Sequence, residues 1–213
     1  MKAFYSPHIQ EIPKGFESQF KPFGMGPDAA KNLARRLSLS KPSGPIILLG
    51  SAGGLRENLK PGECFIINEI YFQNGFEKMS VPRSLEFLPQ AKLVSVEQPV
   101  TRSEIKKSLG QSSGCDLVDC EMSFFWDEIS DDLKSQIIFI RGVLDPASEN
   151  LDFLNAYKIH WQGLIHPRNL FQFIKFVRNF FHYQSGIEKF FRQVAEQLQL
   201  RDDSEVTSEI EIF

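Results

Sequence analysis

The sequence predicts an α/β fold, with helices and strands layered around a mostly parallel sheet. Apolar, β-branched runs recur along the chain, each bounded by Pro, Gly, Ser or charged residues, as buried strands are. Amphipathic helical patterns lie between and after these runs. The 213 residues are 42% hydrophobic, which is enough to bury one sizeable core.

The expected strands lie in five runs. In chain order these are MKAFYS, PIILLG, ECFIINEIYF, AKLVSVE and SQIIFIRGVL, at residues 1–6, 45–50, 63–72, 91–97 and 135–144. Because strands that alternate with helices usually pair in parallel through crossover connections, these runs predict a mostly parallel sheet.

Two helices are predicted between these strands, over residues 26–37 and 115–129. Their apolar positions at helical spacing are Ala30, Leu33, Ala34 and Leu37 in the first, and Val118, Met122, Phe125 and Ile129 in the second. Each helix would therefore present one apolar face to the sheet.

The chain changes character from Pro167 onward. Apolar residues at helical spacing, many of them phenylalanines, predict one long helix or a helix pair, with Pro167 at its start and Gly186 as a weak point or break. Such a stripe is typical of core or of a subunit interface. We expect a single domain over residues 1–200 and an acidic, disordered tail over residues 201–213.

Bulk properties exclude several classes of protein. The net charge of −3 provides no basic field, so nucleic acid is not an expected partner. No signal-peptide core and no run of about 20 apolar residues is present, which predicts a soluble, cytoplasmic protein without a transmembrane segment. The three cysteines and four histidines match neither a disulfide framework nor a metal-ligand spacing, so no metal site is expected.

A glycine-rich segment, Gly50-Ser51-Ala52-Gly53-Gly54, directly follows the second expected strand. At the carboxyl end of a strand, residues without a Cβ let the backbone approach an anion or a sugar. The spacing matches neither a dinucleotide fingerprint nor a P-loop, and a tight turn explains it equally well.

Three acidic residues also follow strand-like runs. Asp145 comes directly after a buried strand, Glu121 lies within an otherwise apolar stretch, and Glu11 follows the first strand. A carboxylate is costly in the core but can face a pocket at a strand end, where it accepts hydrogen bonds from sugar hydroxyls. Each acid alone is typical of a protein surface; the three together indicate a site.

The segments GMGPDAAKNLARRL, LLGSAGGLRENLKPGE, CDLVDCEMS and IRGVLDPAS, in this order, resemble the nucleoside phosphorylase and nucleosidase superfamily. Its hopanoid-associated branch of adenosylhopane phosphorylases is most similar, and methylthioadenosine/S-adenosylhomocysteine nucleosidase is similar at a greater distance. The resemblance implies a three-layer αβα fold with a central mixed, mostly parallel sheet, and a chemistry that cleaves the N-glycosidic bond.

The resemblance also implies a role for each matching residue. Glu121, within a segment like V-D-M-E-S, would hold the ribose hydroxyls, with Cys120 and Met122 as neighbouring substrate contacts. Asp145 would protonate or hydrogen-bond the purine N7, and Glu11 would activate water. The residues implied near the sugar and the attacking water or phosphate are Ser51, Ala52, Gly53, Gly24 and Gly26.

Two residues depart from the superfamily pattern. Cys120 replaces a methionine, which keeps an apolar wall at some loss of volume. Leu144 replaces the serine before the catalytic aspartate, which removes a hydroxyl that could orient Asp145. A catalytically weak, nucleoside-binding protein of the same fold therefore stays open as an alternative.

The sequence also leaves open whether water or phosphate accepts the sugar. Phosphate is usually bound by arginines or a helix N-terminus. Gly24, Gly26 and the N–H groups after Pro27 could form an anion nest, with Arg56 or Arg102 reaching in. The sparse basic residues near the glycine-rich segments slightly favour water, whereas the similarity to phosphorylases favours phosphate.

The sequence thus predicts cleavage of a purine nucleoside, a 5′-substituted adenosine, with release of adenine and a role in hopanoid biosynthesis. A small-substrate nucleosidase for methylthioadenosine or futalosine is the alternative within the enzymes. No cofactor is expected, with phosphate as the one candidate co-substrate. The expected partner is a small-molecule nucleoside, and a homodimer stays open because phenylalanine-rich helices often bury against a partner.

Overall fold

The structure is a computed structural model that describes residues 3–73, 75–152 and 167–198. The strands are β1 (Ala3–Ser6), β2 (Phe20–Pro22), β3 (Ile46–Gly54), β4 (Cys64–Phe72), β5 (Gly75–Lys78), β6 (Gln90–Ser95), β7 (Leu117–Asp119) and β8 (Ile137–Asp145). The helices are η1 (Ile9–Glu11), α1 (Pro27–Ser40), η2 (Arg83–Leu85), α2 (Ser103–Ser113), α3 (Met122–Glu128), α4 (Asp131–Lys134) and α6 (Pro167–Gln197).

All eight described strands belong to one mixed sheet, and five of their eight pairings are parallel. β3 is the centre: β8 pairs with it in parallel along one edge, while β1 and then β7 share the other edge. Because β8 also pairs with β4, and β4 connects through β6 to β7, these five strands close into a ring.

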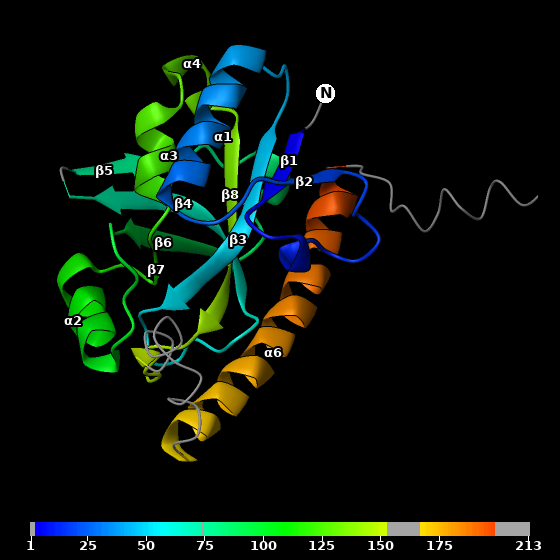
Figure 1. Ribbon diagram of the computed structural model, residues 1–213. Coiled ribbons are helices and arrows are strands. Elements are labelled where there is room, and N and C mark those ends of the chain that lie inside the picture. The colour runs from blue at the N-terminus through cyan, green and yellow to red at the C-terminus, as the bar shows by residue number, and fades with distance from the viewer. Residues whose placement is uncertain (1–2, 74, 153–166, 199–213) are drawn as a thin grey trace, which may run out of the picture.

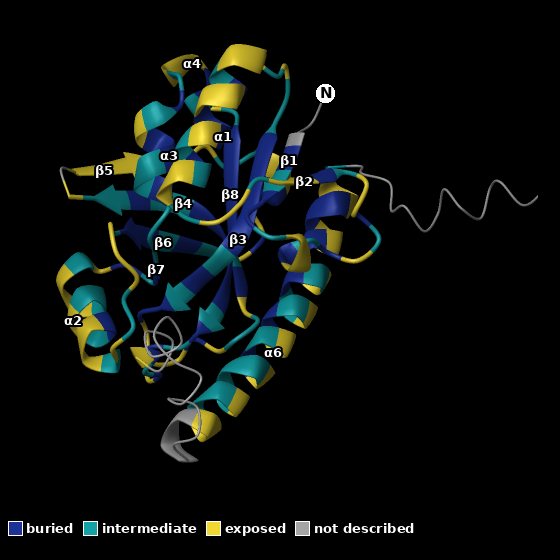
Figure 2. Cartoon of the chain, viewed as in Figure 1, coloured by how far each residue is buried: buried dark blue, intermediate teal, exposed yellow. Residues whose placement is uncertain are grey.

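Helices cover both faces of the sheet (Figure 1). Ile46 and Leu48 of β3 face the core under α1, α3 and α4, whereas Ile47 and Leu49 face the core under α6. This alternation follows from the two-residue period of a strand. Figure 2 shows the result: β3 and β8 are buried along most of their length, and the outer faces of the helices are exposed.

Helix α6 lies unusually close to the sheet where it crosses the turn before β4. A Cβ on Gly186 would overlap the backbone oxygen of Gly62, and a Cβ on Gly142 would lie 2.6 Å from the ring of Tyr183. Tyr183 is fully buried. The missing side chains therefore let α6 place this tyrosine directly against β8.

The predicted α/β class and mixed, mostly parallel sheet are confirmed. All five predicted strands are present, and β3 runs through Gly54, so the glycine-rich segment belongs to the strand and does not form the tight turn that the sequence also allowed. The sheet is not a flat middle layer, because five of its strands close into a ring, and β1 and β7 pair with different parts of β3.

The helix predicted over residues 115–129 is shorter than expected, because Val118 lies on β7 and the helix begins at Met122. The Asp119 side chain accepts hydrogen bonds from the N–H groups of Glu121 and Met122, as a helix-capping residue does, and so ends the strand and starts α3. The break considered at Gly186 does not occur, since α6 is continuous across it. The tail predicted over residues 201–213 lies outside the described residues.

Candidate active site

The glycine-rich segment of β3, from Gly50 to Gly54, makes room for charged side chains of β8. In the sheet register, Gly50 lies opposite Arg141 and Gly53 lies opposite Asp145, with a bulge between Ala52 and Gly53. A Cβ on Gly50 would lie 3.2 Å from the Arg141 guanidinium, and one on Gly53 would lie 3.5 Å from the Asp145 carboxylate. The glycines therefore let a buried cation and a buried carboxylate lie beside the central strand.

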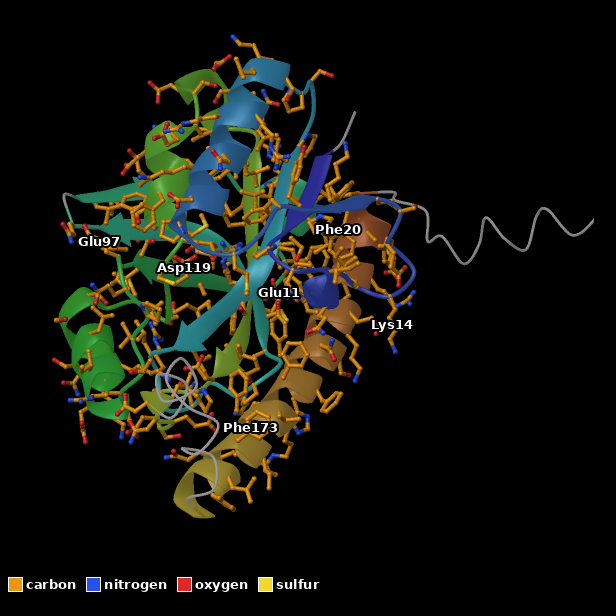
Figure 3. The ribbon with its side chains drawn as sticks, viewed as in Figure 1. Glu11, Lys14, Phe20, Glu97, Asp119 and Phe173 are labelled. Carbon is orange, nitrogen blue, oxygen red and sulfur yellow. The ribbon has the colours of Figure 1, made fainter. Side chains whose placement is uncertain are left out.

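A cavity of about 240 Å³ lies at this point of the sheet. Four carboxyl groups line it: Glu11, Asp119, Glu121 and Asp145. They come from η1, the β7–α3 junction and β8, so the fold brings together acids separated by up to 134 residues (145 − 11). Figure 3 labels Glu11 beside β3 and Asp119 at the end of β7.

Most of the residues predicted from sequence line this cavity. Those present are Glu11, Ser51, Ala52, Gly53, Cys120, Glu121 and Asp145. Met122 is buried beneath it and contacts Arg141. Gly24 and Gly26 do not line it, although Met25 between them does.

Glu121 is held by the turn that the sequence suggested as an anion nest. Gly24 and Gly26 both have positive φ angles, of 99° and 90°, which favour glycine. The Gly26 N–H donates to Glu121 Oε1 at 2.5 Å. Burial raises the pKa of the Glu121 carboxyl, while this hydrogen bond and then Arg141 lower it. The Gly26 N–H of this turn therefore binds a carboxyl group of the protein itself.

Glu11 is 8% exposed and lies on η1. Burial raises the pKa of its carboxyl, and the Ser51 hydroxyl and then Arg141 oppose that effect. Its Oε2 atom is buried without a hydrogen-bonded partner of good geometry in the described part of the chain. A lone pair is thus available for a ligand or a water inside the cavity.

Asp145 is paired with a lysine that the sequence did not indicate as functional. Lys106 of α2 is fully buried, and its ammonium donates to Asp145 Oδ2 and to the carbonyl oxygens of Pro146 and Glu149, at 3.3 and 3.1 Å. Burial raises the pKa of the Asp145 carboxyl to about 6, although the Lys106 charge lowers it. The carboxyl therefore exchanges its proton near neutral pH, as expected for a general acid.

Arg141 is the second residue that sequence reasoning missed. It lines the cavity and is 5% exposed. Its Nε donates to Asp119 Oδ2 at 3.2 Å, its Nη1 to the carbonyls of Leu48 and Ile140, and its Nη2 to Met122 Sδ. The signal was present in the sequence, because an arginine inside the run IIFIRGVL must find partners when that strand is buried.

The arginines proposed from sequence as phosphate ligands lie elsewhere. Arg56 pairs with Asp116 and Arg102 with Asp152, and both arginines are more than half exposed. Within residues 3–73, 75–152 and 167–198, no group of three or more His, Cys, Asp or Glu could hold a metal ion. None of the described helices is long and apolar enough to cross a membrane.

The fold is similar to that of solved nucleosidase structures, in line with the sequence resemblance. The structure is similar to an MTA/SAH nucleosidase, with a TM-score of 0.67 and 12% identity, over 95% of this chain and 97% of that one. The 5′-methylthioadenosine/S-adenosyl homocysteine nucleosidase of Campylobacter jejuni is similar too, with a TM-score of 0.66 and 11% identity over 93% and 98% of the two chains.

The native futalosine hydrolase of Helicobacter pylori has a TM-score of 0.66 and 12% identity, over 93% of this chain and 97% of the other. A further similar structure is a variant nucleosidase of Helicobacter pylori with 5′-methylthioadenosine in its active site. No family model and no curated protein sequence matches the chain. At these identities the likeness establishes the fold, and function must be argued from the site.

Proposed function

We propose that the protein cleaves the N-glycosidic bond of a purine nucleoside, a 5′-substituted adenosine, and releases adenine. One observation carries this proposal: Glu11, Glu121 and Asp145 line the same cavity, beside the glycine-rich segment of β3. The similar structures are nucleosidases and a futalosine hydrolase, which supports the same class of reaction.

Asp145 acts on the leaving base. When the glycosidic bond breaks, its electron pair moves onto the purine, which leaves more readily if N7 is protonated. A carboxyl with a pKa of about 6 retains a proton at higher pH than a free aspartate, whose pKa is about 3.9. It is also acidic enough to donate that proton in the transition state.

The sugar side of the cavity is negatively charged. Glu11, Asp119 and Glu121 share one buried cation, Arg141, whereas Lys106 is paired with Asp145 on the base side. An excess of carboxylates stabilises the positive, oxocarbenium-like charge that develops on the ribose. Glu121, fixed by Gly26, accepts hydrogen bonds from the ribose hydroxyls.

Water is the acceptor that this arrangement supports. A phosphate dianion is usually held by several N–H donors, yet four of the five N–H groups of Arg141 already donate to protein atoms. The negative charge of the cavity also opposes an anionic co-substrate. Glu11, with its available Oε2, takes a proton from the attacking water.

The direct test is release of adenine from adenosine, methylthioadenosine and a 5′-alkylated adenosine, with and without phosphate. We expect release that does not require phosphate and that falls by about 10²- to 10⁴-fold in Asp145→Asn. Asp127→Asn, at an exposed position of α3, is the matched control and keeps its activity.

Two results would contradict the proposal. Release that requires phosphate would identify a phosphorylase and overturn the assignment of water. Binding of nucleosides with no adenine release from any substrate would favour the nucleoside-binding alternative, which rests on Leu144 and Cys120 in place of the superfamily's serine and methionine.

The lining of the cavity supports a substrate with an apolar 5′ group. Its apolar side chains include Met25, Val100, Leu144 and Leu151. Such a wall suits the long substituent of an adenosylated hopanoid, the specific substrate that the sequence resemblance suggests, and it also suits the small thioether of methylthioadenosine. Comparing rates on the two kinds of substrate distinguishes them.

We also retain the expectations of a cytoplasmic protein and a homodimer. The exposed apolar side chains of Phe171, Ile174 and Phe181 on α6 support a dimer, because burying them against a second copy would remove apolar surface from water.

A further inference from the structure

The Lys106–Asp145 pair joins α2 to the end of β8 inside the candidate site. Lys106 is fully buried, and the Asp145 side chain is 9% exposed. The ammonium has three donors, and the structure provides three acceptors: Asp145 Oδ2 and the carbonyls of Pro146 and Glu149. Every donor of this ammonium is thus paired with an oxygen of the protein.

Lys106 donates to one of the two carboxylate oxygens of Asp145, a residue that lines the cavity. Oδ2 is held by Lys106, and no described side chain other than Lys106 donates a hydrogen bond to Asp145. The preceding residue, Leu144, carries no hydroxyl and cannot orient the carboxyl. Asp145 therefore has its orientation from a lysine 39 residues earlier in the chain.

The other charged group that acts on Asp145 has partners of its own. Glu149 is the second charge that acts on the carboxyl, and it raises the pKa of Asp145. Its own carboxylate is held by Lys175 and Asn179 of α6, at 2.8 and 2.7 Å. Lys106 is thus the described cation placed to stabilise the ionised form of Asp145.

We propose that Lys106 is the positioning residue of the general acid: it aims Asp145 Oδ1 at the leaving base and stabilises the carboxylate that remains after proton transfer. This inference rests on the proposed nucleosidase function and adds a residue to it.

The step balances as follows. The glycosidic C–N bond breaks and its electron pair goes to the purine, while the Oδ1 proton of Asp145 goes to purine N7. Water adds its oxygen to the anomeric carbon and gives one proton to Glu11. Asp145 is left as a carboxylate paired with the Lys106 ammonium, and it regains a proton from solvent when the base departs. Lys106 itself neither gains nor loses a proton.

The test compares two leaving groups in Lys106→Met, which retains the length of the side chain but removes its charge. Adenine needs a proton to leave, whereas p-nitrophenolate, released from p-nitrophenyl riboside, does not. We expect Lys106→Met to lower kcat for adenine release by about 10²-fold or more and to leave p-nitrophenolate release within about twofold. Lys107→Met, which removes a half-exposed surface partner of Glu57, is the control and leaves both unchanged.

The pH profile of kcat distinguishes a positioning role from a merely structural one, because loss of a structural contact would leave the pH of its alkaline limb unchanged. Without the Lys106 charge, the pKa of Asp145 rises further, so the alkaline limb of kcat moves to higher pH by about one unit or more while the maximum falls. Lys106→Arg keeps the positive charge, so the alkaline limb of its kcat–pH profile stays at the wild-type pH even though the changed geometry lowers kcat. This second variant keeps the test decisive if Lys106→Met does not fold.

An equal loss with both leaving groups in Lys106→Met, or a moved limb in Lys106→Arg, would overturn the inference. These outcomes are distinct from failure of the proposed function, which would appear as a wild-type protein that releases no adenine from any nucleoside.

Discussion

In the proposed reaction, Asp145 combines two demands on one carboxyl group: it must keep a proton until the base leaves, and it must give that proton up easily. Burial satisfies the first demand and Lys106 the second, and the balance raises the pKa of Asp145 to about 6. The carboxyl is therefore protonated below that pH and ionised above it.

The pH dependence of adenine release follows from the protonation states of the acids in the candidate site. We expect kcat to fall on the alkaline side as Asp145 loses its proton, with a limb at or above about pH 6, and to fall on the acid side as Glu11 gains one. Steady-state kinetics across the pH range measures both limbs. A limb at the pKa of an ordinary aspartate, about 3.9, would contradict this assignment, and the Asp145 limb should vanish in Asp145→Asn.

Three of the four acids that line the cavity were predicted from sequence, whereas Asp119, Arg141 and Lys106 were missed, and for Lys106 the sequence has no local signal. Asp145, Glu121 and Glu11 each follow or interrupt an apolar run, which is a local signal. Lys106 lies in RSEIKKSL, where either lysine could face solvent, and only the packing of α2 against the end of β8 buries one and leaves the other at the surface. A contact between distant segments leaves no pattern in a single sequence.

At the scale of elements, α6 depends on glycines that belong to other segments. Gly62 and Gly142 make room for it, and Gly186 lets it approach the Gly62 turn. The sequence suggested Gly186 as a weak point because glycine is a poor helix former. The helix is continuous across Gly186, which is one of the two alternatives left open from sequence, and apolar residues on either side of Gly186 pack into the core.

A methyl group at this crossing should destabilise the fold. We expect Gly186→Ala to lower the free energy of unfolding by about 1–3 kcal/mol, because the added Cβ overlaps the Gly62 backbone and the helix must move outward. Ser185→Ala, one residue earlier and exposed, is the matched control and should change stability by a few tenths of a kcal/mol at most. Denaturant midpoints measure both, and an unchanged midpoint in Gly186→Ala would refute the close contact.

Element prediction succeeded where the apolar runs were long and failed where they were short. The five predicted strands include β3 and β8, whose buried runs are unmistakable. The three-residue β2 and the fully exposed β5 escaped, since neither carries an apolar run, and α2 escaped because it buries only a narrow face. These elements form only because the rest of the sheet provides their partners.

At the scale of the whole molecule, the prediction of a single domain over residues 1–200 leads to a test. The two large cores lie on opposite faces of the same strands and share β3, β4 and β8. We therefore expect one cooperative unfolding transition, with coincident curves from circular dichroism and tryptophan fluorescence. Separate transitions would show that α6 and its core unfold independently of the α1–α3 side.

The closed ring of β3, β8, β4, β6 and β7 has a consequence for how the protein behaves when concentrated. A strand with an unpaired edge is a template for joining other chains, but a ring offers no such edge. Among the described strands, only β2 and β5 remain at the margins of the sheet. One is three residues long and ends in Pro22, and the other is short and carries Glu77 and Lys78, so both discourage the strand-to-strand stacking that leads to aggregation.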